Sequence, residues 1–133
     1  MTEKQQKLAQ WHQLKYHLDS ERDRVPLVKE QEVWWCALGE NIGVEINGKS
    51  HWFSRPVLIL KKLSHRSFII IPFTSQNKKG NWYTHFRFLG KNQVAVLSQE
   101  RVISVERLYT KIGTIDDNDY QKIKDDFKKL LSL

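Results

Sequence analysis

The chain has 133 residues, of which 40% are hydrophobic and 28% charged, values that fit one folded domain. It has no apolar stretch of about 18 residues, so no membrane-spanning helix is expected. The net charge of +7 suits a polyanionic partner, although a solvated basic surface gives the same balance. The single cysteine, Cys36, excludes an internal disulfide. Because the first residues are polar and lack the apolar core of a signal peptide, we expect a cytoplasmic protein.

Residues 4–20 are predicted to form a helix. Apolar residues recur at three-to-four-residue spacing and make one narrow stripe, at Leu8, Trp11, Leu14 and Leu18. A charged run and a proline then indicate a linker over residues 19–30. We therefore divide the chain into an N-terminal helix and linker, residues 1–30, and a main domain, residues 31–133. A stripe this narrow needs a partner surface, either on the main domain or on a second chain.

From residue 32 the pattern changes to short apolar and aromatic runs separated by turn residues, which indicates strands. We expect strands over residues 33–38, 54–62, 66–74, 82–89, 94–97, 102–104 and 107–112. In residues 82–89 the strict alternation places Trp82, Thr84, Phe86 and Phe88 on one face. Residues 39–50 are expected to form a long loop, in which Asn47-Gly48 is the signal for a hairpin turn.

A second helix is expected after the last strand, capped by Asp116 or Asp117. Its apolar stripe consists of Tyr120, Ile123, Phe127, Leu130 and Leu131. Several short strands followed by a helix indicate a mainly β (α+β) fold, a small and strongly curved antiparallel sheet or partly open barrel.

Polar groups stand at the ends of two neighbouring runs. Arg55 opens the run at residues 54–62, and Thr74, Ser75 and Gln76 close the run at residues 66–74. If the two runs pair as a hairpin, these groups meet at the same end of the sheet. An arginine beside hydroxyl and amide groups is a suitable site for an anionic ligand.

Familiar catalytic motifs are absent from the sequence, including the phosphate-binding glycine loop, Gly-x-Ser-x-Gly and His-x-x-x-His. The histidines His51, His65 and His85 lie in separate elements, so no metal site and no cofactor are predicted. Cys36 lies inside an expected strand, where a thiol is usually buried and inert.

Short motifs follow one another in order between residues 32 and 131. They are Val33-Trp34-Trp35 with Gly39, then Ile42-Gly43-Val44-Glu45, Arg55-Pro56-Val57, Pro72-Phe73-Thr74-Ser75-Gln76, and residues 97–104 followed by Arg107-Leu108 and Lys111-Ile112-Gly113. In this order and spacing they resemble the MazF/PemK family, the toxins of type II toxin–antitoxin systems.

The resemblance implies an SH3-like β-barrel with a C-terminal helix, usually assembled as a homodimer. Most members of that family cleave single-stranded RNA without a metal ion, and the implied partners are therefore RNA and a cognate acidic antitoxin. The family's arginine before proline matches Arg55, its strand-end threonine matches Thr74, and the acidic residue of its first loop matches Glu45.

The matched residues suit metal-free RNA cleavage, in which the 2′-hydroxyl attacks the adjacent phosphate. Arg55 would stabilise the charge on the phosphorane, and Thr74 would donate a hydrogen bond to a phosphate oxygen. Glu45 is the candidate general base, with His51 or His85 as alternatives.

Substrate-binding residues are expected around this centre. Aromatic rings would stack on unpaired bases and basic side chains would hold the backbone. The expected set is Trp52, Ser75, Gln76, Lys78, Lys79, Tyr83 and His85.

Two features depart from the family pattern. The segment of residues 46–54 is longer than usual, and residues 1–30 have no counterpart in compact members. The N-terminal helix could cover the groove, extend the dimer or form a partner interface. Two other functions remain open on this fold: a non-nucleolytic toxin that inhibits a protein such as a topoisomerase, and a plain nucleic-acid-binding module.

Overall fold

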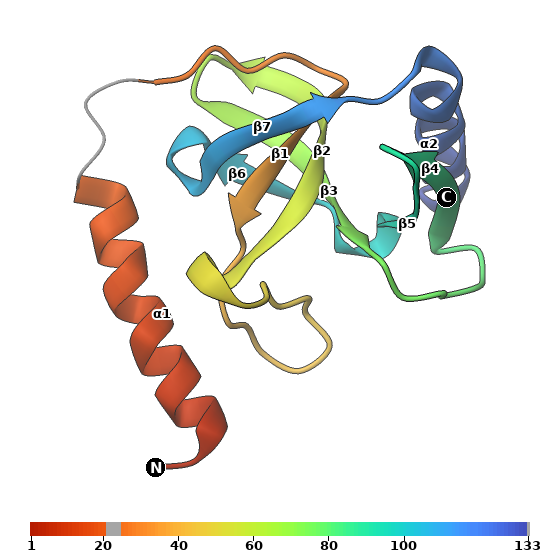
Figure 1. The fold of residues 1–133 in the computed structure, drawn as a ribbon. Coiled ribbons are helices and arrows are strands. Elements are labelled where there is room, and N and C mark those ends of the chain that lie inside the picture. Colours follow the sequence, from red (N-terminus) through yellow and green to blue (C-terminus); the bar gives the residue numbers. More distant parts are fainter. Residues whose placement is uncertain (21–24, 133) are drawn as a thin grey trace.

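An antiparallel sheet of seven strands forms the body of the computed structural model, which describes residues 1–20 and 25–132 (Figure 1). Its strands are β1 (Glu32–Ala37), β2 (Ser54–Ser64), β3 (Ser67–Thr74), β4 (Tyr83–Phe88), β5 (Lys91–Val96), β6 (Arg101–Ser104) and β7 (Leu108–Thr114). The short 3₁₀ helices are η1 (His51–Phe53), η2 (Leu97–Gln99) and η3 (Val105–Arg107). Helices α1 (Glu3–Ser20) and α2 (Asp117–Leu130) lie on opposite sides of the sheet (Figure 1). The expected mainly β (α+β) fold is confirmed.

Strand β3 holds the two parts of the sheet together. The strand order is β4-β5-β3-β2-β1-β7, and β6 also pairs with β3. Residues 67–70 of β3 pair with β6, whereas Phe73 and Thr74 pair with β5. Because one strand changes partner along its length, the sheet curves around its apolar side chains instead of lying flat. Phe68, Ile70 and Phe73 are at most 1% exposed and fill the interior.

Two turns differ from the sequence expectation. β5 begins at Lys91 rather than at residue 94, because Leu89 and Gly90 both have positive φ, 51° and 76°, and reverse the chain within two residues. Trp82 was expected on one face of this strand, together with Thr84 and Phe86, but it precedes β4 and is 56% exposed.

The expected hairpin at Asn47-Gly48 is not formed. In the loop of residues 39–50, all of which are described, the bridge joins Lys49 to Ser54, so the chain reverses at residues 50–53. Gly48 is instead required by a close contact, since a Cβ atom there would lie 1.5 Å from the carbonyl oxygen of Phe53.

Helix α2 packs as its stripe predicts. Asp116 caps it by accepting a hydrogen bond from the Asp119 amide over 2.8 Å. Ile123 is fully buried, and three further members of the stripe pack beside it, namely Tyr120, Phe127 and Leu130. Leu131 was expected in the stripe, but it follows the last helical residue and is 54% exposed.

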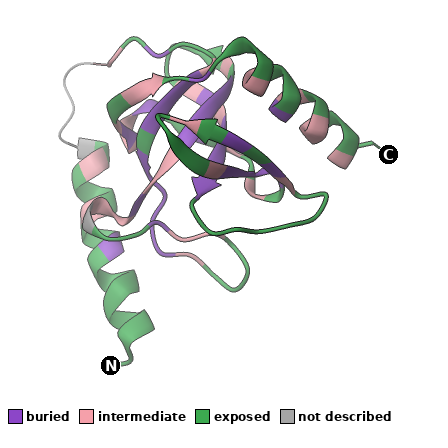
Figure 2. Cartoon of the chain, turned by 45° about the vertical axis from the view of Figure 1, so that its right-hand side comes forward, coloured by how far each residue is buried: buried purple, intermediate pink, exposed green. Residues whose placement is uncertain are grey.

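Helix α1 starts one residue earlier than expected, at Glu3. The Thr2 hydroxyl accepts from the Gln5 amide over 3.1 Å, and the Gln5 side chain accepts from the Thr2 backbone nitrogen over 2.8 Å. This reciprocal pair is a capping box, whose T-x-x-Q signal is visible in the sequence. Figure 2 shows α1 exposed along most of its length. The expected linker residues 21–24 lie outside the described part, within which no helix is long and apolar enough to cross a membrane.

Candidate functional site

The β2–β3 hairpin brings Arg55 and Thr74 to one end of the sheet, as the sequence predicts for paired runs. Val57 pairs with Pro72 in this hairpin. The same register, carried two residues further, sets Arg55 opposite Thr74. The two side chains therefore come from adjacent strands, which is a rigid way to hold two polar groups beside each other.

The Arg55 guanidinium is oriented by backbone carbonyl groups. Its Nε donates to the carbonyl oxygen of Asn47 over 2.5 Å, and its Nη1 donates to that of Phe73 over 3.5 Å. Burial lowers the pKa of Arg55, but an arginine stays protonated at neutral pH. No described carboxylate forms an ion pair with it. The site thus holds a half-buried positive charge that no carboxylate in the described part of the chain neutralises.

The Thr74 hydroxyl lies at the end of β3 and is nearly covered by the fold, with 7% of the residue exposed. Its oxygen accepts a hydrogen bond from the Gln76 amide over 3.2 Å. A hydroxyl that already accepts keeps its own proton for donation. Thr74 can therefore donate toward an anion beside Arg55.

Two pockets meet at this pair. The first, here called the Tyr109 pocket, has a volume of about 440 Å³. It is lined by Trp35, Lys49, Ser50, Ser54, Arg55, Pro56, Phe73, Thr74, Ser75, Gln93 and Tyr109. The second, the Gln99 pocket, has about 530 Å³ and is lined by Val44, Ile46, Arg55, Thr74, Gln76, Lys78, Trp82, Tyr83, Val96, Ser98 and Gln99. An extended anionic ligand lying in both pockets would place its charge at Arg55 and Thr74.

Four of the expected substrate-binding residues line these pockets. Ser75 lies in the Tyr109 pocket, and Gln76, Lys78 and Tyr83 lie in the Gln99 pocket. Lys79 is exposed on the loop between β3 and β4 and lines neither pocket.

His85 is exposed on β4, and its Nε2 forms a short hydrogen bond with the carbonyl oxygen of Lys78. The imidazole therefore fixes the basic loop and lines neither pocket.

Trp52 lies against other rings of the protein. Its ring centroid is 5.5 Å from that of Tyr109 and 6.2 Å from that of His17 on α1. Trp52 thus contacts Tyr109, which lines the Tyr109 pocket, and is not itself among the residues lining it.

Glu45 is not brought to the Arg55–Thr74 pair. Its carboxylate accepts from the Ile42 amide over 3.0 Å within its own exposed loop. It lines a separate pocket of about 260 Å³, together with Glu100 and Arg101. The side chain of His51, an alternative base, lies outside the described part of the structure.

Several residues that line the two pockets were not expected from the sequence. Gln99 supports the first loop, because its side chain accepts from the Ile46 amide over 3.0 Å and donates to the Val44 carbonyl over 3.3 Å. Nothing in its local pattern signals this contact. Tyr109 could have been found, since it follows the buried Leu108 and the alternation of β7 turns it to the other face.

Cys36 is fully buried, as its strand position predicts, and burial raises the pKa of its thiol to about 12. Such a thiol is not a nucleophile at neutral pH. Within residues 1–20 and 25–132, no three His, Cys, Asp or Glu side chains gather as metal ligands.

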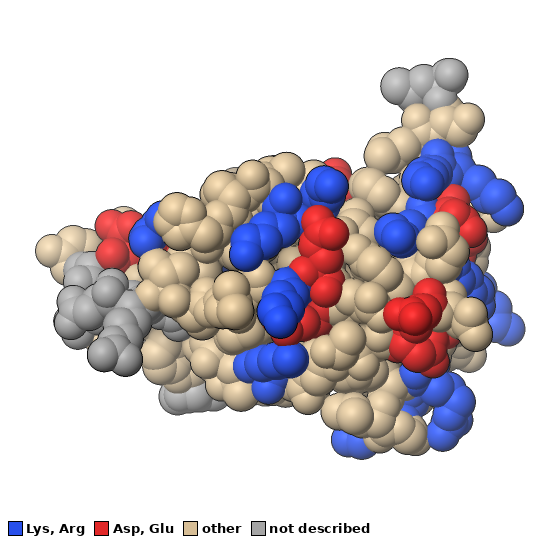
Figure 3. All heavy atoms as spheres, turned by 90° about the horizontal axis from the view of Figure 1, so that it is seen from above, with Lys and Arg blue, Asp and Glu red and all other residues tan. Residues whose placement is uncertain are grey.

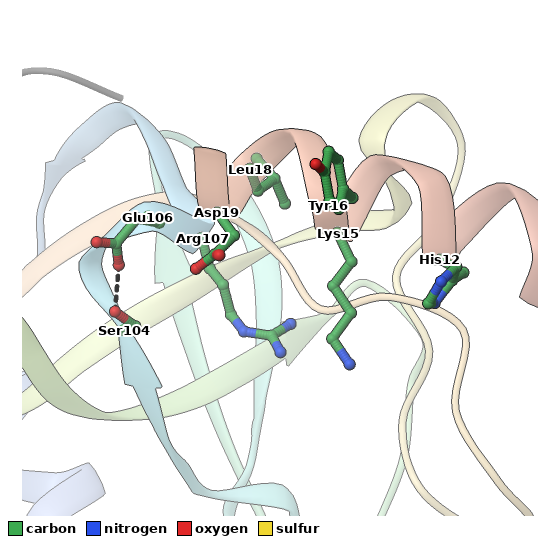
Figure 4. Close-up of a pocket in the computed structure, with 8 residues that line it drawn as sticks. All are labelled: His12, Lys15, Tyr16, Leu18, Asp19, Ser104, Glu106 and Arg107. Atoms are coloured by element: carbon green, nitrogen blue, oxygen red, sulfur yellow. Dashed lines mark hydrogen bonds between the residues drawn. The ribbon is translucent and has the colours of Figure 1, made fainter. Parts of the chain in front are cut away.

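The positive charges are interrupted on the face that Figure 3 shows. On the face seen in Figure 3, lysines and arginines alternate with carboxylates. A further pocket of about 380 Å³, the α1 pocket, lies beneath the N-terminal helix and contains none of the expected site residues (Figure 4). The Arg55–Thr74 region therefore remains the candidate site.

Solved structures share this fold. MazF from Deinococcus radiodurans superposes with a TM-score of 0.65 at 19% identity, covering 84% of this chain and 100% of that one. The MazE–MazF complex from the same organism gives 0.61 at 16% identity, covering 84% and 99%. An endoribonuclease in complex with its cognate antitoxin, from a mycobacterial species, gives 0.62 at 14% identity, covering 81% and 96%.

The chain is also similar to the damage-control phosphatase ARMT1 of Homo sapiens, at 29% identity over 126 residues. The match takes in 90% of this chain but spans only 28% of that protein. A family model described as the PemK-like, MazF-like toxin of type II toxin–antitoxin systems matches residues 29–131. That match leaves out α1 and takes in the whole sheet, the Arg55–Thr74 pair and α2. The chain therefore belongs to the PemK-like, MazF-like toxin family of type II toxin–antitoxin systems.

Proposed function

We propose that this protein is a cytoplasmic, metal-independent endoribonuclease, the toxin of a toxin–antitoxin pair, which cleaves single-stranded RNA through attack of a 2′-hydroxyl on the adjacent phosphate. The observation that carries the proposal is the half-buried, unneutralised Arg55 opposite Thr74, at the point where two pockets meet. RNA would lie across both pockets with the scissile phosphate at this pair.

Arg55 and Thr74 would stabilise the pentavalent phosphorane, which carries more negative charge than the phosphate it forms from. Two carbonyl groups orient the guanidinium, and its Nη2 is left to donate to a phosphate oxygen. The Thr74 hydroxyl would donate to another. Donors fixed before the reaction stabilise developing charge without reorganising, and losing one costs about 10²–10³ in rate.

The residues of the Gln99 pocket would hold the nucleotides on one side of the cleaved bond. Tyr83 and the exposed Trp82 offer ring faces for stacking. Lys78 and the neighbouring Lys79 would bind backbone phosphates. On the other side, Ser75 in the Tyr109 pocket offers a hydrogen bond.

The general base is proposed from the sequence rather than from this geometry. Glu45 is the first candidate, although its loop places it in a separate pocket. The pH profile of cleavage distinguishes the candidates. If Glu45 is the base, Glu45→Gln should remove the acidic limb, whereas His85→Gln should leave that limb unchanged.

Cleavage of single-stranded RNA in the presence of a chelator tests the chemistry. The wild type is expected to cut and to leave a 2′,3′-cyclic phosphate. Arg55→Ala is expected to lower kcat/KM by at least about 10²-fold. The matched control is Arg87→Ala, because Arg87 is an exposed arginine on β4 that donates to Asn92 and to the Gly90 carbonyl at its own turn.

Four outcomes would contradict this proposal. Loss of cleavage with chelator removes the metal-free mechanism, and full activity of Arg55→Ala removes the site. Binding of RNA without any cut strand, or toxicity that survives Arg55→Ala, would favour a binding module or a toxin acting on a protein such as a topoisomerase.

The proposed partners are a second copy of the chain and an acidic antitoxin. Two of the similar solved structures are toxin–antitoxin complexes, which supports an antitoxin here. Co-expression with an acidic protein encoded beside this gene should relieve toxicity. Sedimentation of the purified protein should give twice the monomer mass.

A further inference from the structure

Helix α1 lies outside the matched family region, yet it touches the segment that leads into Arg55. Among its described residues, the one buried side chain is Trp11, which is 6% exposed. The Trp11 ring lies 5.8 Å from that of Phe53, and the Arg107 guanidinium lies 5.5 Å from the Trp11 ring centroid. Gly39 completes the socket, because a Cβ atom there would lie 2.1 Å from Cε2 of Trp11. The indole is therefore held on several sides.

Arg107 is fixed in this socket from the sheet side. Its Nη1 donates to the Ala37 carbonyl over 3.1 Å. Figure 4 shows its side chain beneath α1, extending in the same direction as that of Lys15. The contact with the Trp11 ring is a cation–π interaction, which is stronger where water is excluded.

The segment that receives α1 has a strained backbone. Ser50, Trp52 and Phe53 have positive φ values of 55°, 66° and 49°. This left-handed region disfavours residues with a large side chain, and such conformations persist only where surrounding contacts impose them.

The contacts that impose this conformation come from two directions. From the sheet side, the Phe53 carbonyl oxygen accepts from the amides of Leu38 and Gly39 over 2.9 and 3.0 Å. From outside, α1 places Trp11 against Phe53 and His17 against Trp52.

The strained segment forms part of the wall of the candidate site. Ser50, its first residue, and Ser54, which follows it, line the Tyr109 pocket with Arg55. The Ser54 hydroxyl donates to the Trp52 carbonyl over 3.1 Å, and the Trp52 ring lies on Tyr109. A change in the segment therefore moves both the entrance to β2 and the Tyr109 wall.

We infer that α1 is a clamp that holds residues 50–53 in their strained conformation and so positions Arg55 and the Tyr109 pocket, with Trp11 as its anchor and His17 as its second contact. These are positioning residues, because neither lines the pocket. The effect on RNA cleavage rests on the proposed function, whereas the effect on the segment does not.

Hydrogen exchange and RNA cleavage, measured on the full chain, test the clamp. In Trp11→Ala the amides of residues 49–54 are expected to exchange about tenfold faster or more, because these contacts are local. Peptides from β4 and β5 should exchange as in the wild type, which reports that the barrel is folded. Trp11→Phe should restore most of the protection. Gln13→Ala, an exposed position on α1, is the matched control.

The cleavage assay distinguishes a helix α1 that positions the candidate site from one that only packs on the domain. In Trp11→Ala, kcat/KM is expected to fall about tenfold or more, with Trp11→Phe recovering most of it and Gln13→Ala unchanged. Faster exchange with unchanged cleavage would show that the segment does not position the site. Unchanged exchange at residues 49–54 would overturn the clamp outright.

If Trp11→Ala fails to fold, His17→Ala provides a second test of whether α1 clamps residues 50–53. It removes an exposed side chain and should loosen residues 50–53 more weakly in the same direction, and no change would contradict the clamp. If the wild type cuts no RNA, the proposed function fails, and the exchange of residues 49–54 alone then decides whether α1 clamps the segment.

Discussion

Helix α2 sets one buried and three partly buried side chains against a core cluster, namely Ile123, Tyr120, Phe127 and Leu130, whereas the one buried side chain among the described residues of helix α1 is Trp11. In α2, Ile123 is completely buried among the residues of one core cluster, which includes Phe86. In α1, Trp11 is the buried residue of the described part, and Leu8 is 38% exposed. Helix α1 is the longer of the two, with 18 residues against 14, so the difference lies in how many side chains pack on the core and not in size.

This difference separates two roles that helices have in small domains. A helix that closes the core cannot leave without exposing the sheet, so α2 contributes to the global free energy of unfolding. A helix attached by one buried ring and a few surface contacts can detach while the barrel remains folded, so α1 acts on local structure. The three predictions that follow test this division.

The largest expected effect is on the core helix. Ile123→Ala should lower the free energy of unfolding by about 2–5 kcal/mol, because it leaves a cavity in the interior. Trp11→Ala removes a larger side chain but should cost less, because detachment of α1 alone limits the loss. Urea unfolding followed by far-UV circular dichroism gives both values. A larger loss in Trp11→Ala would contradict the division.

The next largest effect on the free energy of unfolding is expected at the two helix caps. Asp116→Ala, at the start of α2, should lower the free energy of unfolding by about 1 kcal/mol, since the Asp119 amide loses its acceptor. Thr2→Ala breaks the capping box of α1 but should change global stability by less than about 0.5 kcal/mol. Asn118→Ala, an exposed position in the first turn of α2, is the control. Equal losses at both caps would mean that α1 and α2 unfold together with the sheet.

The smallest expected effect is a pH dependence at Glu32. Burial alone would raise the pKa of Glu32, but hydrogen bonds from Lys111, the Lys29 amide and Trp34 outweigh it and lower the pKa below 4.5. The folded state therefore favours the carboxylate. The resulting stability is present above about pH 4.5 and is lost as the pH falls through the lowered folded pKa.

In Glu32→Gln, the unfolding midpoint should accordingly fall less steeply with decreasing pH than in the wild type. The neighbouring Gln31 donates to Asp117 at the start of α2 over 2.8 Å. The part of the sheet next to α2 is therefore expected to loosen first as the pH falls. Hydrogen exchange at low pH would locate it. An acid limb that is equally steep in Glu32→Gln would assign the sensitivity to other groups.

Much of the fold follows from the local pattern of the sequence. The apolar runs that became β2 and β3 are long, β-branched and separated by a short polar turn, which leaves few other ways to pair them. That pairing alone placed Arg55 beside Thr74. The cap and stripe of α2 were equally readable, because capping and helical periodicity depend on residues three and four apart.

The segment of residues 50–53 could not be predicted in the same way. No local rule places Trp52 and Phe53 in the left-handed region, which their side chains disfavour. The conformation depends on contacts with Gly48, Gly39 and Trp11, and Trp11 lies about forty residues earlier in the chain. For the same reason Trp52 was expected to stack on a base and instead packs between Tyr109 and His17.

The pairing of β1 with β7 has a consequence for the order of folding. The β2–β3 hairpin joins neighbouring segments, whereas Glu32 of β1 pairs with Thr114 of β7, near the end of the sequence. Contacts so distant along the chain form late. Since β7 supplies Tyr109, a chain still being synthesised can pair Arg55 with Thr74 but has no second wall for the Tyr109 pocket. If the protein is a nuclease, its activity begins only after the C-terminal strand has left the ribosome.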